Sequence, residues 1–324
     1  MPLEDFVEVY SVRDLLGVGA FGVVLQVKNK VTNERSALKI IPKEKLSKHA
    51  LSILKNESTI MAQMRHPSVV AFKRIFENAK FIILEMELIR GGQLKQVFKR
   101  VDSDGKPQAM TDLEASKIIK SLLEGVAYIH ERSIIHRDIK PENILLTEAS
   151  QSCTEVKIID FGLSAEFNLR LGKDATEKAG TLIYMAPEQV ALENYSKKVD
   201  IWPVGIIMYQ LLTNGKHPCF NKGESSNEYI QKMRNIDSKP LKWEFNENFS
   251  ELAKDFFLKL CSYPPNQRYD ANRALMHPWL TRNERDEIPL TRKQEILNFA
   301  RGIDLRKAMR VAYFTSQMKL QFSN

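Results

Sequence analysis

The sequence predicts an α+β fold of two lobes: a small lobe with a five-stranded antiparallel sheet and one helix, and a larger, mostly helical lobe. Three observations support this prediction. Residues 9–41 alternate as strands do, residues 43–64 have helical spacing, and residues 69–76 and 81–87 again have strand character. Helical periodicity dominates from residue 92 onward. A chain of 324 residues also exceeds one simple core and suits two lobes with an extension.

A glycine-rich turn lies between the first two expected strands. Residues 16–24 read Leu-Gly-Val-Gly-Ala-Phe-Gly-Val-Val, the pattern G-x-G-x-x-G-x-V. Dinucleotide-binding turns share this spacing, but they run from a strand into a helix, with an acidic residue about 20 positions further on. Here strand-like runs at 10–15 and 23–28 flank the glycines, so we expect a hairpin tip. An ordinary glycine-rich hairpin would have the same pattern.

In the larger lobe, the clearest helix signal begins at residues 111–114. These read Thr-Asp-Leu-Glu, a capping box, and the polar, turn-rich stretch 102–107 precedes them as a loop. The helix that follows has an apolar stripe at helical spacing. This stripe includes Leu113, Ile118, Leu122, Val126 and Ile129.

Residues suited to catalysis are concentrated at 136–143, which read His-Arg-Asp-Ile-Lys-Pro-Glu-Asn, and at an Asp-Phe-Gly that begins at Asp160. Asp138 is a carboxylate that can accept a hydroxyl proton, and Lys140 places a cation two residues further on. Asn143 and Asp160 supply oxygen ligands for magnesium. This set belongs to phosphoryl transfer, in which the protein positions groups and neutralises charge rather than doing covalent chemistry.

The combination resembles the protein kinases, and three later stretches extend the resemblance. Residues 180–188 are similar to the end of a kinase activation segment, and residues 200–205 and 266–269 match two motifs of the large lobe. In the family, a glutamate and an arginine of these motifs pair inside the large lobe, and an aspartate braces the catalytic loop. The resemblance carries these structural roles to Glu188, Arg268 and Asp200.

The resemblance covers about residues 9–280 and implies a division of the chain. Residues 1–89 would form the N-terminal, ATP-binding lobe, and residues 90–280 the C-terminal lobe with the catalytic loop, activation segment and substrate site. Residues 281–324 would form a basic extension. The implied cofactors are ATP and Mg2+, and the implied substrates are proteins. Asp138 would orient the substrate hydroxyl.

The resemblance also implies a nucleotide site in the small lobe. Lys39 matches the lysine for the α- and β-phosphates, and Glu57, ten residues before Pro67, matches its ion-pairing glutamate. Taken alone, Lys39 would be a solvated strand residue and Glu57 a surface charge. Adenine would bond to the hinge at 87–89, with Met86 at the gatekeeper position. The expected nucleotide-binding set is Leu16, Gly17, Gly19, Gly22, Val24, Ala37, Lys39, Glu57, Met86, Glu87, Ile89, Gln93 and Glu142.

The kind of hydroxyl acceptor can also be predicted. Lys140 lies two residues after the expected base, and Gly-Thr at 180–181 precedes Ala-Pro-Glu, which together are the serine/threonine pattern. Tyrosine kinases carry an arginine-containing catalytic loop without this lysine. At finer level, residues 136–143 and 186–189 resemble the calcium- and calmodulin-regulated kinases, particularly the calcium-dependent kinases of plants and protists.

Three positions depart from the family's pattern. Pro203 replaces a small polar residue, and near a helix start its missing N–H should cost little. Gln93 replaces a glutamate common in kinases that prefer basic substrates, so we expect that preference to be weaker, though not abolished because Glu142 remains. Glu177 stands where many kinases carry an activating phosphothreonine. Its carboxylate could pair permanently with the arginine of the catalytic loop, and Thr176 is the alternative phosphorylation site.

The C-terminal tail resembles the junction segment of a calcium-dependent kinase. Residues 301–319 carry five basic side chains and one acidic side chain, Asp304. A basic amphipathic helix is typical of a calmodulin target, a membrane-surface helix or an inhibitory segment, although a helix simply packed on the large lobe would fit too. The chain contains no EF-hand loop. Either a separate calcium sensor, calmodulin or another EF-hand protein, binds residues 295–320, or the chain is cut before a sensor of its own. The apolar anchors are Leu305, Met309, Ala312 and Met318.

Composition excludes several other classes of protein. The net charge of +8 is dispersed, without a nucleic-acid recognition motif. No apolar run approaches the roughly 20 residues of a membrane span, and the N-terminus is not a signal peptide. The three cysteines lack metal spacing, so we expect reduced thiols in a cytoplasmic protein. We also expect the protein to be a monomer. A catalytically dead scaffold is the remaining alternative, but it should have lost Lys39, Asp138 or Asp160.

Overall fold

The fold is described from a computed structural model. The structure describes residues 8–19, 22–46, 51, 62–150, 152–160, 182–221 and 223–282. The chain divides into two compact units, residues 1–281 and 282–324. Apart from Arg282, the second unit lies outside the described residues, and so do the expected regulatory helix and its apolar anchors. The expected lobe boundary at residue 89 stays a prediction.

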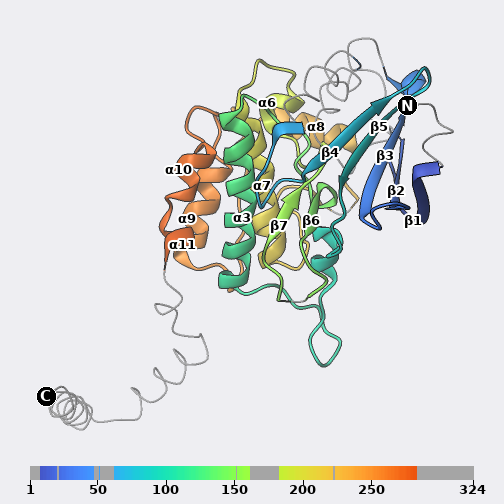
Figure 1. Ribbon diagram of the computed structural model, residues 1–324. Helices are drawn as coiled ribbons and strands as arrows, with labels where there is room; N and C mark the ends of the chain where they lie inside the picture. The colour runs from blue at the N-terminus through green and yellow to red at the C-terminus, as the bar shows by residue number, and fades with distance from the viewer. Residues whose placement is uncertain are drawn as a thin grey trace, which may run out of the picture. The chain divides into compact units, whose positions relative to one another are not determined.

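The first lobe contains the five-stranded antiparallel sheet predicted from the sequence, in the order β1-β2-β3-β5-β4 (Figure 1). Its strands are β1 (Tyr10–Gly19), β2 (Gly22–Asn29), β3 (Arg35–Pro42), β4 (Phe72–Glu77) and β5 (Phe81–Glu87). One face of the sheet packs on the main core. The other face buries a separate cluster, because successive strand residues point to opposite faces. That cluster contains Tyr10, Val27, Leu38 and Ile83.

Two element boundaries in this lobe differ from the prediction. The strand expected from residue 69 begins only at Phe72, because residues 68–70 instead pair with β7 (Val156–Ile158) of the large lobe: Ile158 donates to Ser68, and Val70 donates to Ile158. The helix expected from residue 43 starts as a short 3-10 turn, η1 (Lys43–Lys45), which ends in extended backbone at Leu46. Most of the remaining predicted helix lies outside the described residues.

The second lobe is mostly helical, as predicted. Helices α3 (Asp112–Glu131) and α7 (Ile201–Leu212) pack together at its centre, and α9, α10 and α11 lie beside them (Figure 1). The described part of the chain includes no helix that is both long and apolar enough to cross a membrane. The remaining elements of this lobe are η2 (Leu94–Lys99), η3 (Pro141–Asn143), β6 (Ile144–Leu146), α6 (Pro187–Val190), η4 (Lys197–Asp200), α8 (Ser226–Arg234), α9 (Glu251–Leu260), α10 (Ala271–Leu275) and α11 (Pro278–Thr281).

The capping box predicted at the start of α3 is present. The Thr111 hydroxyl accepts from the Glu114 backbone N–H at 3.2 Å, and the Glu114 carboxylate accepts from the Thr111 N–H at 2.9 Å. Such a cap contributes about 1 kcal/mol. Four residues of the predicted apolar stripe are fully buried, and the first, Leu113, is half-buried. The stripe therefore holds α3 against the core.

Pro203 is the third residue of α7, whose twelve residues are all buried. The first four N–H groups of a helix have no partner within it, so the proline removes no helical hydrogen bond. We expect Pro203→Ser to change the free energy of unfolding by about 1 kcal/mol or less, as measured by urea denaturation. In contrast, Met208→Pro in the same helix should cost about 3 kcal/mol or more. Equal losses for the two variants would contradict this interpretation.

Candidate active site

Asp200, at the end of η4, holds the catalytic loop in place through hydrogen bonds to its backbone. Its carboxylate accepts hydrogen bonds from the backbone N–H groups of His136 and Arg137, at 2.8 and 2.7 Å, and a third from the His130 ring at 2.8 Å. Asp200 is 1% exposed. Arg137 has a φ of 65°, a left-handed conformation that is uncommon without glycine. Asp200 therefore braces the loop, as predicted, and supports this backbone conformation.

Asp138 is oriented by two residues of the same loop. Lys140 Nζ lies 2.8 Å from Asp138 Oδ2, and Asn143 Nδ2 donates to the same oxygen at 2.8 Å and to the Asp138 carbonyl at 2.9 Å. Asp138 Oδ1 is buried and has no partner among the described residues. One carboxylate oxygen is thus held in place, and the other remains able to accept a proton.

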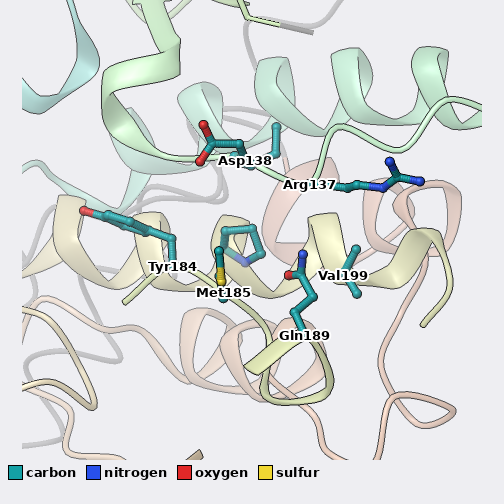
Figure 2. A pocket seen from close by; sticks show the side chains of 8 residues that line it. Arg137, Asp138, Tyr184, Met185, Gln189 and Val199 are labelled. Carbon is teal, nitrogen blue, oxygen red and sulfur yellow. The ribbon is translucent and has the colours of Figure 1, made fainter. Parts of the chain in front are cut away.

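The same catalytic loop borders a small cavity, shown in Figure 2. Arg137 and Asp138 are neighbours in the chain but point toward opposite ends of it. Tyr184 and Met185, which precede α6, line the cavity together with Pro203 of α7. The segment before α6 therefore lies directly beside the candidate base.

Asp160 meets Lys39 across the two lobes. Lys39 Nζ bonds to Asp160 Oδ1, and the lysine is only 8% exposed. Burial by itself raises the pKa of the Asp160 carboxyl, but the charge of Lys39 and its hydrogen bond outweigh that effect, so the pKa is lowered. The carboxylate is consequently ionised at neutral pH. Glu57, the expected partner of Lys39, lies outside the described residues, so that ion pair stays a prediction.

Asn143 and Asp160 could hold a magnesium ion. Mg2+ usually keeps several waters and takes one or two carboxylates together with substrate phosphates, so it does not need a full protein cage. The donor set fits this habit, because Asn143 provides an amide oxygen and Asp160 an ionised carboxylate. Within the described ranges, no group of three or more His, Cys, Asp or Glu residues could hold a metal by itself.

The glycine-rich turn is the tip of the β1–β2 hairpin, where Gly19 pairs with Gly22. Gly22 and Gly17 differ in whether the surrounding structure leaves space for a side chain. A Cβ at Gly22 would lie 1.9 Å from the Ile40 carbonyl oxygen, so close strand packing requires glycine there. A Cβ at Gly17 would meet no described atom within 4 Å. Leu16, in the same strand, is 45% exposed.

The floor of the expected nucleotide site is formed by paired strand residues. Val24 of β2 lies opposite Lys39 of β3, and Ala37 lies opposite Met86 of β5. Ala37 and Met86 are buried, and Val24 is half-buried. Because β3 pairs with both neighbours, these four expected residues come from three adjacent strands.

The hinge is tied to both lobes through Glu87. Its backbone N–H donates to the Ala71 carbonyl at 3.0 Å, and its carboxylate accepts from the Ala71 N–H at 2.7 Å and from Lys157 Nζ at 2.8 Å. Ile89, two residues on, packs against the core. At the start of η2, Gln93 Nε2 donates to the Glu142 carbonyl at 3.1 Å. This bond brings together two residues of the expected nucleotide-binding set, a contact that the sequence analysis did not predict.

Comparison with known families agrees with this geometry. The protein kinase domain matches residues 10–280. The chain belongs to the protein kinase family, and it is a serine/threonine protein kinase. It is 35% identical over 280 residues to myosin light chain kinase A of Dictyostelium discoideum, covering 85% of this chain and 89% of that protein. It is 33% identical over 304 residues to calcium/calmodulin-dependent protein kinase type 1B of Rattus norvegicus, covering 92% of this chain and 83% of that protein.

One ion pair inside this kinase was predicted from the sequence, and another was missed. Glu188 and Arg268 pair as predicted, with distances of 2.6 and 3.1 Å and almost no exposure. The Lys157–Glu87 bridge between β7 and the hinge was not foreseen, because no local pattern signals it. Glu177 and Thr176 lie outside the described residues, so the predicted role of Glu177 stays a prediction.

Proposed function

We propose that this kinase transfers the γ-phosphoryl group of ATP, with Mg2+, to serine or threonine hydroxyls of protein substrates. The observation that carries the proposal is the state of Asp138: Lys140 and Asn143 hold one carboxylate oxygen, while the buried second oxygen has no partner among the described residues. A substrate hydroxyl bonded to this oriented carboxylate would be positioned for attack, as general-base catalysis requires.

The other residues provide charge. Lys140 would neutralise charge that develops on the transferring phosphoryl group, and Lys39 would contact the ATP phosphates. Asn143 and Asp160 would hold Mg2+, which supplies charge neutralisation on those phosphates. A buried and preorganised set of this kind needs little rearrangement during the reaction, which is the main source of its catalytic power.

A radiolabelled-phosphate transfer assay with a serine-containing protein substrate tests this proposal. Transfer should require ATP and should stop when EDTA removes the divalent cation. Phosphoamino-acid analysis should then find phosphoserine or phosphothreonine. Transfer to tyrosine alone, or no transfer with intact folded protein, would contradict the proposal.

We also propose that residues 295–320 restrain the kinase and bind a calcium sensor, and that the protein acts in the cytoplasm. The support is the junction-like sequence, its excess of basic residues and its apolar anchors, together with a relative named for calcium/calmodulin dependence. A basic amphipathic helix can offer one apolar face either to the kinase or to calmodulin, so the two partners would exclude each other.

Truncation after Leu280 should therefore raise the basal transfer rate, because the restraint is removed. A peptide of residues 295–320 should bind calmodulin only when calcium is present, measured by isothermal titration. Met309→Glu in that peptide should weaken binding, since it places a charge in an apolar groove. If the peptide ignores calmodulin and truncation unfolds the domain, the tail has a structural role instead.

A further inference from the structure

A buried hydrogen-bonded cluster lies outside the catalytic loop, where α8 and the loop before it meet the segment that precedes α6. His217 and Tyr229 both bond to the backbone carbonyl of Ile183, and the Cys219 backbone N–H donates to the His217 ring. The mechanism proposed above uses none of these side chains. Helices α6 and α8 also pack against each other, so the cluster sits within a continuous packed region (Figure 1).

The tautomer of His217 follows from its two contacts. The backbone N–H of Cys219 can only donate, and it lies 3.2 Å from His217 Nδ1, so Nδ1 is the acceptor. The proton is therefore on Nε2, which donates to the Ile183 carbonyl at 2.9 Å. Burial lowers the pKa of His217 to about 4, so the ring stays neutral at physiological pH.

Tyr229 supplies a second donor to the same carbonyl. Its hydroxyl donates to the Ile183 oxygen at 3.0 Å, and its ring is fully buried. The ring packs edge-on against Phe220, with centroids 5.6 Å apart. A carbonyl oxygen has two lone pairs. The two donors therefore saturate the Ile183 carbonyl and fix its direction.

This fixed carbonyl belongs to the peptide unit that leads into Tyr184. Tyr184 and Met185 line the cavity beside Asp138 (Figure 2). Because this segment lines the same cavity as Asp138, a polypeptide whose hydroxyl reaches Asp138 would pass close to it. We propose that His217 and Tyr229 are positioning residues that hold residues 182–185 in the conformation that binds the protein substrate. This inference rests on the proposed function.

The test compares steady-state constants for Tyr229→Phe with those of the wild-type chain. The substrate is the serine peptide that wild-type protein phosphorylates best in a degenerate library. We expect KM for the peptide to rise about five-fold, the value of one hydrogen bond, while KM for ATP stays within two-fold. His217→Leu should act in the same way. His217→Gln should keep a near-wild-type peptide KM, because its amide N–H can replace the Nε2 donor.

Tyr209→Phe is the matched control, because it too removes a tyrosine hydroxyl that donates to a backbone carbonyl, here that of Glu244 at 2.7 Å. It should leave peptide KM unchanged. Melting temperatures of all variants show whether each one is folded. An unchanged peptide KM in Tyr229→Phe and His217→Leu overturns the positioning role, and so does an equal rise in both KM values. If the wild-type chain transfers no phosphate at all, the proposed function fails instead.

Discussion

Asp160→Asn should lower the rate of phosphoryl transfer by about 10³-fold or more, while leaving the protein folded. The substitution removes the negative charge that would hold Mg2+ and leaves Lys39 without its ionic partner. The asparagine amide oxygen can still accept a hydrogen bond from Lys39, and the Asp160 side chain is 37% exposed, so the fold should survive. The measurement is the initial rate of radiolabelled-phosphate transfer at saturating ATP.

The control for this variant is Asp104→Asn, the same change in an exposed turn of the large lobe. It should retain wild-type activity. Both proteins should melt as cooperatively as the wild type in a thermal scan, which separates loss of chemistry from loss of structure. Wild-type turnover by Asp160→Asn would remove Asp160 from the mechanism.

Breaking the Glu188–Arg268 pair should have the largest effect on stability. Arg268→Met would leave Glu188 as a buried charge without its partner, at a cost of about 3–5 kcal/mol. It would also remove the bonds from Arg268 to the carbonyls of Ser262 and Lys198. Because domains of this kind have only about 5–15 kcal/mol of stability, we expect a large loss of folded protein. The measurement is the free energy of unfolding in urea.

The double variant Glu188→Gln/Arg268→Met separates charge from packing. Since it buries no unpaired charge, it should lose less free energy than the sum of the two single variants. Lys254→Met is the surface control: its pair with Glu251, at 2.7 Å, has a glutamate side chain that is 90% exposed, so the loss should be about 0.5 kcal/mol or less. The argument fails if Arg268→Met costs no more than this control.

Local patterns were sufficient for the parts of the fold that depend on local chemistry. The capping box at Thr111 and the apolar stripe of α3 follow from side-chain hydrogen bonding and helical spacing. The meeting of Asp138, Lys140 and Asn143 was predictable because they lie within six residues. The predicted start of β4 was wrong because residues 68–70 pair with β7, a partner about ninety positions away. No local signal reports such a pairing.

The other contacts that the sequence analysis missed also join residues that are far apart in the chain. Lys157 reaches Glu87 across seventy positions, and Tyr229 reaches Ile183 across forty-six. A lysine in a strand and a tyrosine in an amphipathic helix are both ordinary in their own segments. Their roles depend on which distant backbone groups they contact, and only the packed structure specifies those contacts.

Two of the three glycines in the glycine-rich stretch, Gly17 and Gly22, allow a test of descent among related chains. Gly22 is required by the Ile40 carbonyl of the neighbouring strand, so it should persist even in a descendant that has lost catalysis. Gly17 meets no such obstacle among the described atoms, and nothing in the strand packing would keep it glycine once nucleotide binding no longer mattered. Substitution of Gly17 with retention of Gly22 in a related chain would therefore indicate that nucleotide binding is lost while the strand packing is kept.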